Sequence, residues 1–174
     1  MQQSFEPMIQ TFEVGELARE CESDDATILR FIREAELNDI RPTLGDSLYM
    51  AIKSAPEEFC ALLNGGTFEG CGAVERSFVG VKTALAYYVW GRLMKASPYK
   101  LTRFGVVVKN DDYSHQPDWK ERQVAYNDAF SIADRYMKDC LDYISSTPDL
   151  AQYMNYCDGS DVRSRRNFTK IIGR

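Results

Sequence analysis

The one histidine of the chain, His115, lies beside acids and a serine, a combination that could support nucleophilic catalysis. Asp111, Asp112 and Ser114 precede it, and Asp118 follows it. A catalytic serine also needs a nucleophile-elbow motif and an oxyanion loop, and neither accompanies this histidine. We therefore interpret His115 as a surface loop residue.

Two pairs of adjacent acids have the residue types for general acid–base catalysis. Asp24-Asp25 and Glu57-Glu58 both fall where helices are expected to begin. Acidic side chains stabilise a helix there because they face the positive end of its dipole. We predict that both pairs support helices and have no catalytic role.

The five cysteines are odd in number and contain no CxxC pair. Zinc sites draw on clustered cysteines and histidines, and scattered cysteines favour reduced, mostly buried thiols. The sequence therefore predicts no metal, no cofactor and no enzymatic activity. The cysteines are Cys21, Cys60, Cys71, Cys140 and Cys157.

Three other patterns have a chemical and a structural interpretation. The run Asn64-Gly65-Gly66-Thr67 lacks the spacing of a phosphate-binding loop and predicts a turn. Tyr87, Tyr88 and Trp90 could stack on bases, but their surroundings are apolar on every side, so we expect core residues. Arg92, near the end of the same segment, has to reach solvent, pair with an acid or interact with the helix dipole.

Charge is distributed unevenly along the chain. The net charge is -5, yet residues 162–174 contain five basic residues and no acid, so the rest of the chain is more acidic than the total indicates. An acidic body argues against binding nucleic acid by its phosphates. The basic end is either a solvated terminus or a contact with an acidic partner, another subunit or nucleic acid. Its candidate contact residues are Arg163, Arg165, Arg166 and Lys170.

The length of 174 residues fits one domain with an appended arm. No apolar run is long enough to cross a bilayer, and the N-terminus has no secretory signal, so we expect no membrane association. Residues 1–147 form the expected helical domain, and residues 148–174 form a C-terminal arm with a basic end. Residues 1–12 show no clear period and predict an arm or edge segment.

The apolar periodicity predicts a mainly α helical bundle. A helix over about 25–39 is capped by Ser23-Asp24-Asp25 and ends before Pro42. Glycines at 70 and 72 suggest an irregular connection from Thr67 to Ser77. The further short helices are expected around 14–21, from a cap at Asp46 or Ser47, and from Pro56 to Asn64.

Two long helices dominate this prediction. The segment from Phe78 to Ala96 is apolar all round, which is typical of a helix buried between other elements. The last helix runs from about Asp118 to Ser145, and its apolar stripe includes Ala129, Ala133 and Met137. At about 28 residues it is around 42 Å long. Thr147-Pro148 ends it.

A short extended strand or hairpin is expected near residues 102–113. Thr102 to Lys109 is β-branched and apolar with Gly105 inside it, and residues 110–112 have turn chemistry. The strand belongs either to the subunit's own core or to an edge that pairs with a neighbouring chain. Because the rest of the chain is helical and a lone strand needs a partner, we assign the partner interface to Phe104, Val106, Val107, Val108 and Tyr113.

The same stretches resemble a known family. The segment Asp39-Ile40-Arg41-Pro42-Thr43-Leu44-Gly45-Asp46-Ser47-Leu48-Tyr49, the helix from Gly80 to Arg92, and the run from Phe104 to Ser114 occur in this order. Together they resemble a family of small phage and prophage proteins of Bacteroides-type bacteria, similar to head-tail connector (adaptor) proteins. The similarity covers roughly Phe12 to Ile144, and its motifs are packing residues.

The resemblance implies a helical structural subunit without catalysis. Such subunits form a ring of about twelve copies beneath the portal, continue the DNA channel without sequence-specific binding, and contact portal and tail-completion proteins. We thus expect a virion protein that is found in the bacterial cytoplasm during assembly. The alternatives from the residues alone are a helical protein–protein interaction module and a nucleic-acid-binding regulator that uses the basic tail.

Overall fold

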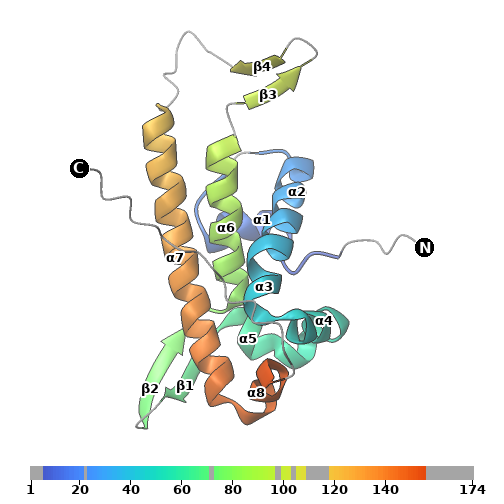
Figure 1. Cartoon of the computed structure of the whole chain (residues 1–174), viewed down its shortest axis with the longest axis vertical. Helices are drawn as coiled ribbons and strands as arrows, with labels where there is room; N and C mark the ends of the chain where they lie inside the picture. Colours follow the sequence, from blue (N-terminus) through green and yellow to red (C-terminus); the bar gives the residue numbers. More distant parts are fainter. Residues whose placement is uncertain are drawn as a thin grey trace.

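The protein folds mainly as helices, and a computed structural model describes residues 6–21, 23–70, 73–96, 99–102, 105–108 and 118–155, with the backbone alone in 99–102, 105–108 and 154–155. The predicted mainly α fold with a long C-terminal helix and a short hairpin is confirmed (Figure 1). No helix among the described residues is long and apolar enough to span a membrane. The elements are α1 (Thr11–Leu17), α2 (Asp25–Ala35), the π-helix η1 (Glu36–Ile40), α3 (Arg41–Leu44), α4 (Asp46–Ser54), the 3-10 helix η2 (Pro56–Phe59), α5 (Cys60–Asn64), β1 (Gly66–Gly70), β2 (Val74–Phe78), α6 (Val81–Ala96), β3 (Tyr99–Thr102), β4 (Gly105–Val108), α7 (Trp119–Ser146) and α8 (Pro148–Asn155).

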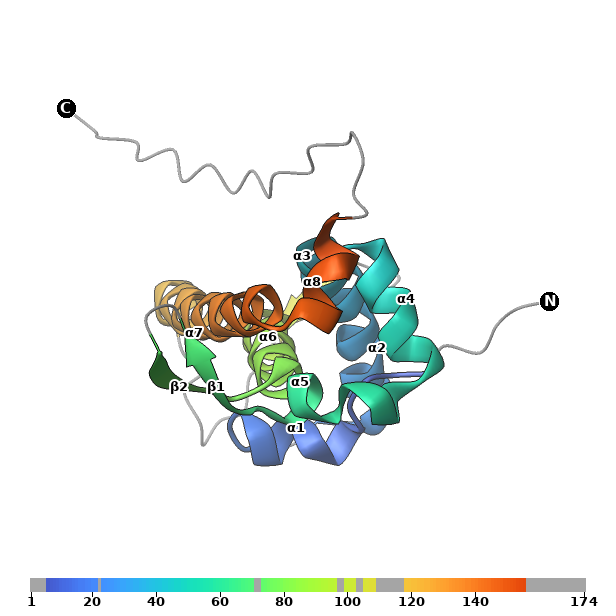
Figure 2. The same cartoon turned by 90° about the horizontal axis from the view of Figure 1, so that it is seen from below.

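Helix α6 is the central element of the core. It lies between α7 on one side and α1 and α2 on the other (Figures 1 and 2). Its buried residues cover every face, as its all-round apolar sequence predicts. Gly91 lets α7 approach closely, because a Cβ at this position would lie 3.1 Å from the Phe130 ring and 3.2 Å from the Ala129 side chain.

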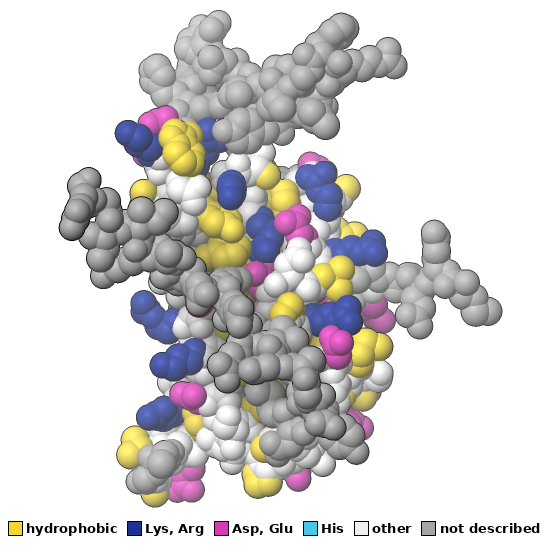
Figure 3. Space-filling view, in the orientation of Figure 1, with side chains coloured by type: hydrophobic (Ala, Val, Ile, Leu, Met, Phe, Trp, Pro, Cys, Tyr) yellow, Lys and Arg dark blue, Asp and Glu magenta, His cyan; other side chains and the backbone are white. Residues whose placement is uncertain are grey.

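Helix α7 is amphipathic, as its sequence predicts. The buried stripe is Ala129, Ala133, Met137, Cys140 and Ile144, at the helical spacing of three or four residues. The opposite side of the helix exposes charged residues, and Figure 3 shows Lys and Arg side chains along the edge that α7 forms. The helix begins at a capping box of Asp118 and Glu121 and ends before Thr147, close to the predicted limits.

The prediction that a helix ends before Pro42 is wrong. The N-cap is Asp24 as expected, because its carboxylate accepts a hydrogen bond from Thr27 N. The chain then stays helical through η1 and α3 to Leu44 and ends at Gly45, whose φ is 82°. Within η1, Arg41 N–H donates to Glu36 O, five residues earlier. Pro42 has no N–H to place and falls in the first turn of α3, where a proline is tolerated.

The irregular connection expected from Thr67 to Ser77 is also wrong, because these residues form an antiparallel hairpin. The register runs from Gly66 opposite Phe78 to Gly70 opposite Val74. Phe68 and Phe78 pack on Tyr143 of α7 with ring centroids 5.6 and 4.4 Å away. These aromatic contacts outweigh the weak strand propensity of the glycines.

Three further details differ from the sequence prediction: the limits of the first helix, the N-cap of α4, and a helix after residue 147. The first short helix is Thr11–Leu17 rather than 14–21, and Ile9 before it is 1% exposed, so this part of the expected arm belongs to the core. Gly45, rather than Asp46 or Ser47, is the N-cap of α4. After Pro148 the chain forms α8, whose Tyr153 packs edge-on against Phe59 with centroids 6.1 Å apart. The division at residue 147 stays a prediction.

Candidate assembly surface

The interface predicted from the sequence centres on the β3–β4 hairpin. Val106, Val107 and Val108 of β4 lie opposite Leu101, Lys100 and Tyr99 of β3. The segment 102–109, expected to be a strand or half of a hairpin, is divided at Gly105, because Thr102 is the last residue of β3 and Gly105 is the first of β4. Phe104, Tyr113 and the basic residues Arg163, Arg165, Arg166 and Lys170 lie outside the described residues.

The two strands of this hairpin pair only with each other in the described part of the chain. Each of them therefore has one edge whose backbone N–H and C=O groups have no strand partner there. A two-stranded hairpin is marginally stable alone, and an unpaired edge is a template for another chain. The geometry agrees with the interpretation of an edge, and contact with a neighbouring chain stays a prediction.

The hairpin lies at the C-terminal end of α6, close to where α7 begins (Figure 1). The first ten residues of α7, from Trp119 to Asp128, contain no buried residue. Trp119 is 59% exposed and Val124 is 68% exposed. This end of the molecule thus combines open strand edges with a helix start that does not contribute to the core.

Arg92 fixes the nearby end of α6 to the rest of the bundle. Its Nη2 lies 2.5 Å from Asp39 Oδ2 and its Nε lies 3.4 Å from Glu34 Oε1. The Arg92 side chain is 12% exposed and that of Asp39 is 4% exposed. The guanidinium also lies 5.0 Å from the centroid of the Phe130 ring on α7. The sequence left solvent, an acid or the helix dipole as alternatives for this charge, and in the structure Arg92 pairs with acids from α2 and η1.

The aromatic residues of α6 belong to the core, as predicted. Tyr88 and Trp90 are buried, and Tyr87 packs edge-on against Tyr136 of α7 with centroids 5.6 Å apart. The Tyr88 hydroxyl lies 2.5 Å from Asp134 Oδ1, to which it donates a hydrogen bond, and its ring packs against Phe130. These rings are engaged within the subunit and are not a base-stacking surface.

The second hairpin, β1–β2, lies at the other end of α6 (Figure 1). The sequence interpretation missed this element. Its signal was limited to residues that favour strands, Phe68 in β1 and Val74 and Phe78 in β2, because Arg76 interrupts the apolar alternation of β2. Gly70 at the end of β1 and Gly72 just after it obscured that signal. Ala73 just before β2 has a φ of 58°, which is typical of a tight hairpin connection.

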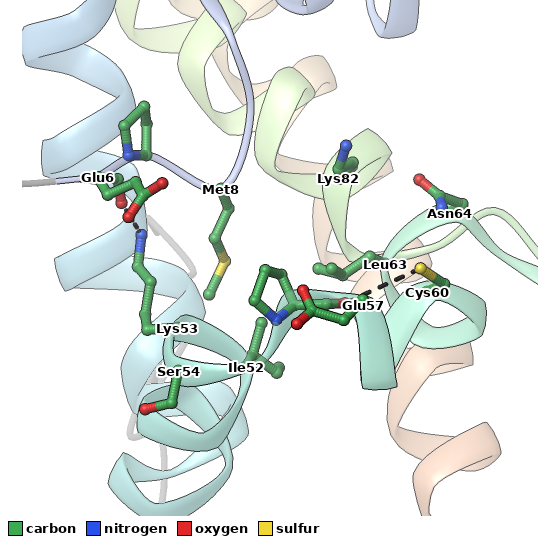
Figure 4. A pocket seen from close by; sticks show the side chains of 12 residues that line it. Glu6, Met8, Ile52, Lys53, Ser54, Glu57, Cys60, Leu63, Asn64 and Lys82 are labelled. Carbon is green, nitrogen blue, oxygen red and sulfur yellow. Dashed lines mark hydrogen bonds between the residues drawn. The ribbon is translucent and has the colours of Figure 1, made fainter.

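A pocket of about 380 Å³ opens between the N-terminal segment and the region from α4 to α5 (Figure 4). Its apolar wall includes Met8, Ile52 and Leu63. Two lysines line it, and both are ion-paired: Lys53 Nζ is 2.6 Å from Glu36 Oε2, and Lys82 Nζ is 3.1 Å from Glu13 Oε1. Its cations are therefore already neutralised, which disfavours an anionic ligand.

The Glu36 carboxylate holds the N-terminal segment against this region. Glu36 is fully buried, and its Oε1 accepts a hydrogen bond from Met8 N at 2.6 Å. The Tyr49 hydroxyl donates to Glu36 Oε2 at 3.2 Å, and Lys53 donates to the Glu6 carbonyl oxygen. Burial, and to a lesser extent the Glu36 charge, raise the pKa of Tyr49 to about 12.

We expect Tyr49 to make stability depend on pH in alkaline solution. The folded protein keeps the phenolic proton to about pH 12, whereas the unfolded chain releases it near pH 10. The stability that this residue contributes is therefore complete below pH 10 and is lost as the pH rises to about 12. Urea unfolding of the wild type and of Tyr49→Phe should show that their difference in unfolding free energy narrows over this interval. A constant difference would contradict the expected shift.

The described cysteines are free thiols. Cys140 is buried, Cys21 is half-buried and Cys60 is exposed. Burial raises the pKa of the Cys140 thiol to about 12 and lowers its reactivity. Within the described ranges, no group of three His, Cys, Asp or Glu side chains is arranged to hold a metal ion. His115 lies outside those ranges.

A protein-family model matches most of the chain. The chain matches the model described as "Family of unknown function (DUF6712)" over residues 40–166, which is well over half of its 174 residues. The chain belongs to this family. The family model begins at the last residue of η1 and takes in α3 to α8, so both hairpins and the α6–α7 pair lie within the family's part of the chain. Comparison with curated proteins and with solved structures gave no match.

Proposed function

We propose that this member of the DUF6712 family is a structural subunit that assembles with copies of itself into a ring. The sequence resemblance extends the proposal to a head-tail connector that joins portal to tail, continues the DNA channel and has no catalytic activity. In this role the protein belongs to the virion and is present in the bacterial cytoplasm during assembly. Its partners are other copies of the chain and the portal and tail-completion proteins.

The observation that carries the proposal is the open β3–β4 hairpin at one end of the helical body. Both of its strands have an unpaired edge in the described chain, and β4 has the sequence Gly-Val-Val-Val. Edge strands of this composition add readily to another sheet. Ring closure needs a heterologous contact, in which one surface of each subunit fits a different surface of the next. A hairpin at one end of the subunit suits that requirement.

The charge of the body also supports a channel role. The net charge of -5 includes the basic residues after position 161, so the body itself is more acidic. An acidic wall repels phosphates, and DNA can therefore slide past it without being held.

We expect Val107→Glu to weaken self-association, because it places a charge on the strand that is proposed to meet the neighbour. The loss should be about thirty-fold in the association constant, which corresponds to an interface residue worth about 2 kcal/mol. Sedimentation and light scattering over a range of protein concentrations measure the association constant. Electron microscopy shows whether rings form.

Met50→Glu is the matched control for this experiment. Met50 lies on α4 and is 57% exposed, so its substitution introduces the same charge on another surface. A wild-type protein that stays monomeric at high concentration would contradict the proposal of a self-assembling subunit. Equal association of Val107→Glu and Met50→Glu would contradict the role of the hairpin.

A further inference from the structure

Helix α6 has a two-stranded hairpin at each of its ends. The β1–β2 hairpin precedes its first residue, Val81, and the β3–β4 hairpin follows its last, Ala96. Figure 1 shows the two hairpins at opposite ends of the molecule. Both are antiparallel, and in the described chain neither pairs with a third strand. The subunit therefore offers open strand edges at two separate places.

In the first hairpin, the more accessible edge belongs to β2. Its residues Val74 to Ser77 are all exposed, and Val74 alone is 58% exposed. Figure 2 shows β2 as the outer strand, with β1 between it and the helices. The aromatic rings of Phe68 and Phe78 pack on α7, so the hairpin is fixed to the body through one face while its outer edge stays accessible.

The charges of this hairpin are unbalanced. Glu69 and Glu75 lie directly opposite each other in the register, and like charges in this position destabilise a strand pair. The nearby cation, Arg76, is drawn to Asp142 of α7, with its Nη1 3.4 Å from Asp142 Oδ2. Among the described residues, neither Glu69 nor Glu75 forms a salt bridge. The pair is therefore suited to a partner that brings positive charge.

The second hairpin has the complementary charge. The sequence from Tyr99 to Lys109 contains Lys100, Arg103 and Lys109 and no acidic residue. Lys100 belongs to β3, opposite Val107. One hairpin thus has an uncompensated pair of acids, and the other has only basic charges.

We propose that the β2 edge of one subunit receives the β3–β4 hairpin of the next, so that the two hairpins form a four-stranded sheet across the contact. This inference rests on the proposed self-assembly and names its second surface. Backbone hydrogen bonds supply the attachment, and the opposite charges of the two hairpin sequences favour this pairing over one between two identical hairpins.

A charge-reversal cycle on the full-length chain tests this pairing. The acceptor variant carries Glu69→Lys and Glu75→Lys, the donor variant carries Lys100→Glu and Lys109→Glu, and a fourfold variant combines them. Each double variant should associate about tenfold more weakly than the wild type at low salt, because the reversal replaces attraction between the two hairpins by repulsion between like charges. The fourfold variant should regain most of the wild-type association, since its charges are complementary again. A mixture of the two double variants should also regain it.

The matched control is Glu57→Lys with Glu58→Lys. These residues lie on η2, and the substitution changes the net charge by the same amount as the acceptor variant. Sedimentation at low and high salt is the measurement, and circular dichroism checks that each variant is folded. At high salt the double variants should lose less of their self-association relative to the wild type, because exposed charges are screened.

The outcomes separate this inference from the proposed function. If the wild type assembles and the acceptor variant behaves like the Glu57/Glu58 control, the β2 edge is not the receiving surface, while self-assembly stands. If both double variants are weak and the fourfold variant does not recover, the two hairpins do not pair with each other. If the wild type stays monomeric throughout, both the pairing and the proposed self-assembly are overturned.

Discussion

Replacing Arg92 by methionine should lower the free energy of unfolding by about 3–5 kcal/mol, the usual cost of removing one partner of a buried ion pair. Asp39 is 4% exposed, and its Oδ2 lies 2.5 Å from Arg92 Nη2. Methionine fills much of the space of the arginine stem but leaves the carboxylate buried without its cation. Urea unfolding followed by circular dichroism measures the change.

Two further variants make the Arg92 prediction specific. Arg135→Met removes an exposed arginine from α7 and should change stability by less than about 0.5 kcal/mol. Combining Arg92→Met with Asp39→Leu should recover most of the loss, because a buried ion pair can often be replaced by apolar residues at little cost. A loss at Arg92 no larger than that at Arg135 would contradict the structural role of the pair.

Gly80→Ala should lower the free energy of unfolding by an amount comparable to that of Arg92→Met, but here the cause is backbone geometry. Gly80 has a φ of 86°, and a Cβ there would lie 2.4 Å from Leu63 O and 2.5 Å from Gly65 N. Gly65 is in a similar position, with a φ of 88° and an added Cβ 2.5 Å from Phe78 O. The expected loss combines about 1–3 kcal/mol of backbone strain with about 1–3 kcal/mol of overpacking.

Gly15→Ala is the matched control for Gly80→Ala. Gly15 lies within α1, and nothing is within 4 Å of a Cβ added there. The same substitution should stabilise the protein by about 0.5–1 kcal/mol, because alanine is the better helix former. Thermal and urea unfolding should therefore move in opposite directions for the two variants. Equal shifts would contradict the close backbone approach at Gly80.

The sequence predicted the structure best where a single pattern of apolar residues extends over many positions. The Ala129 to Ile144 stripe predicted α7 to within about a residue at each end, because a long apolar face can be buried only as a helix. The all-round apolar character of α6 likewise predicted its central position. Asp24 was predicted as a cap because a cap depends on a few adjacent residues.

The elements that the sequence did not predict depend on distant contacts. The β1–β2 hairpin is held by Phe68 and Phe78 against Tyr143, which is remote in the sequence. Pro42 was expected to end a helix, but the π-helical turn before it accommodates the proline. For Arg92 the sequence left solvent, an acid or the helix dipole open, because its partners, Glu34 and Asp39, are more than fifty residues away. Local patterns do not contain such information.

Helix α6 also sets the distance between the two hairpins and the angle between them about its axis. Its 16 residues place its ends about 24 Å apart, and each residue turns the helix by about 100°. A single inserted residue would therefore rotate one hairpin about the α6 axis by more than a quarter turn relative to the other. In a chain of subunits joined through those hairpins, the length of α6 sets the angle between successive copies, and hence whether the series closes on itself.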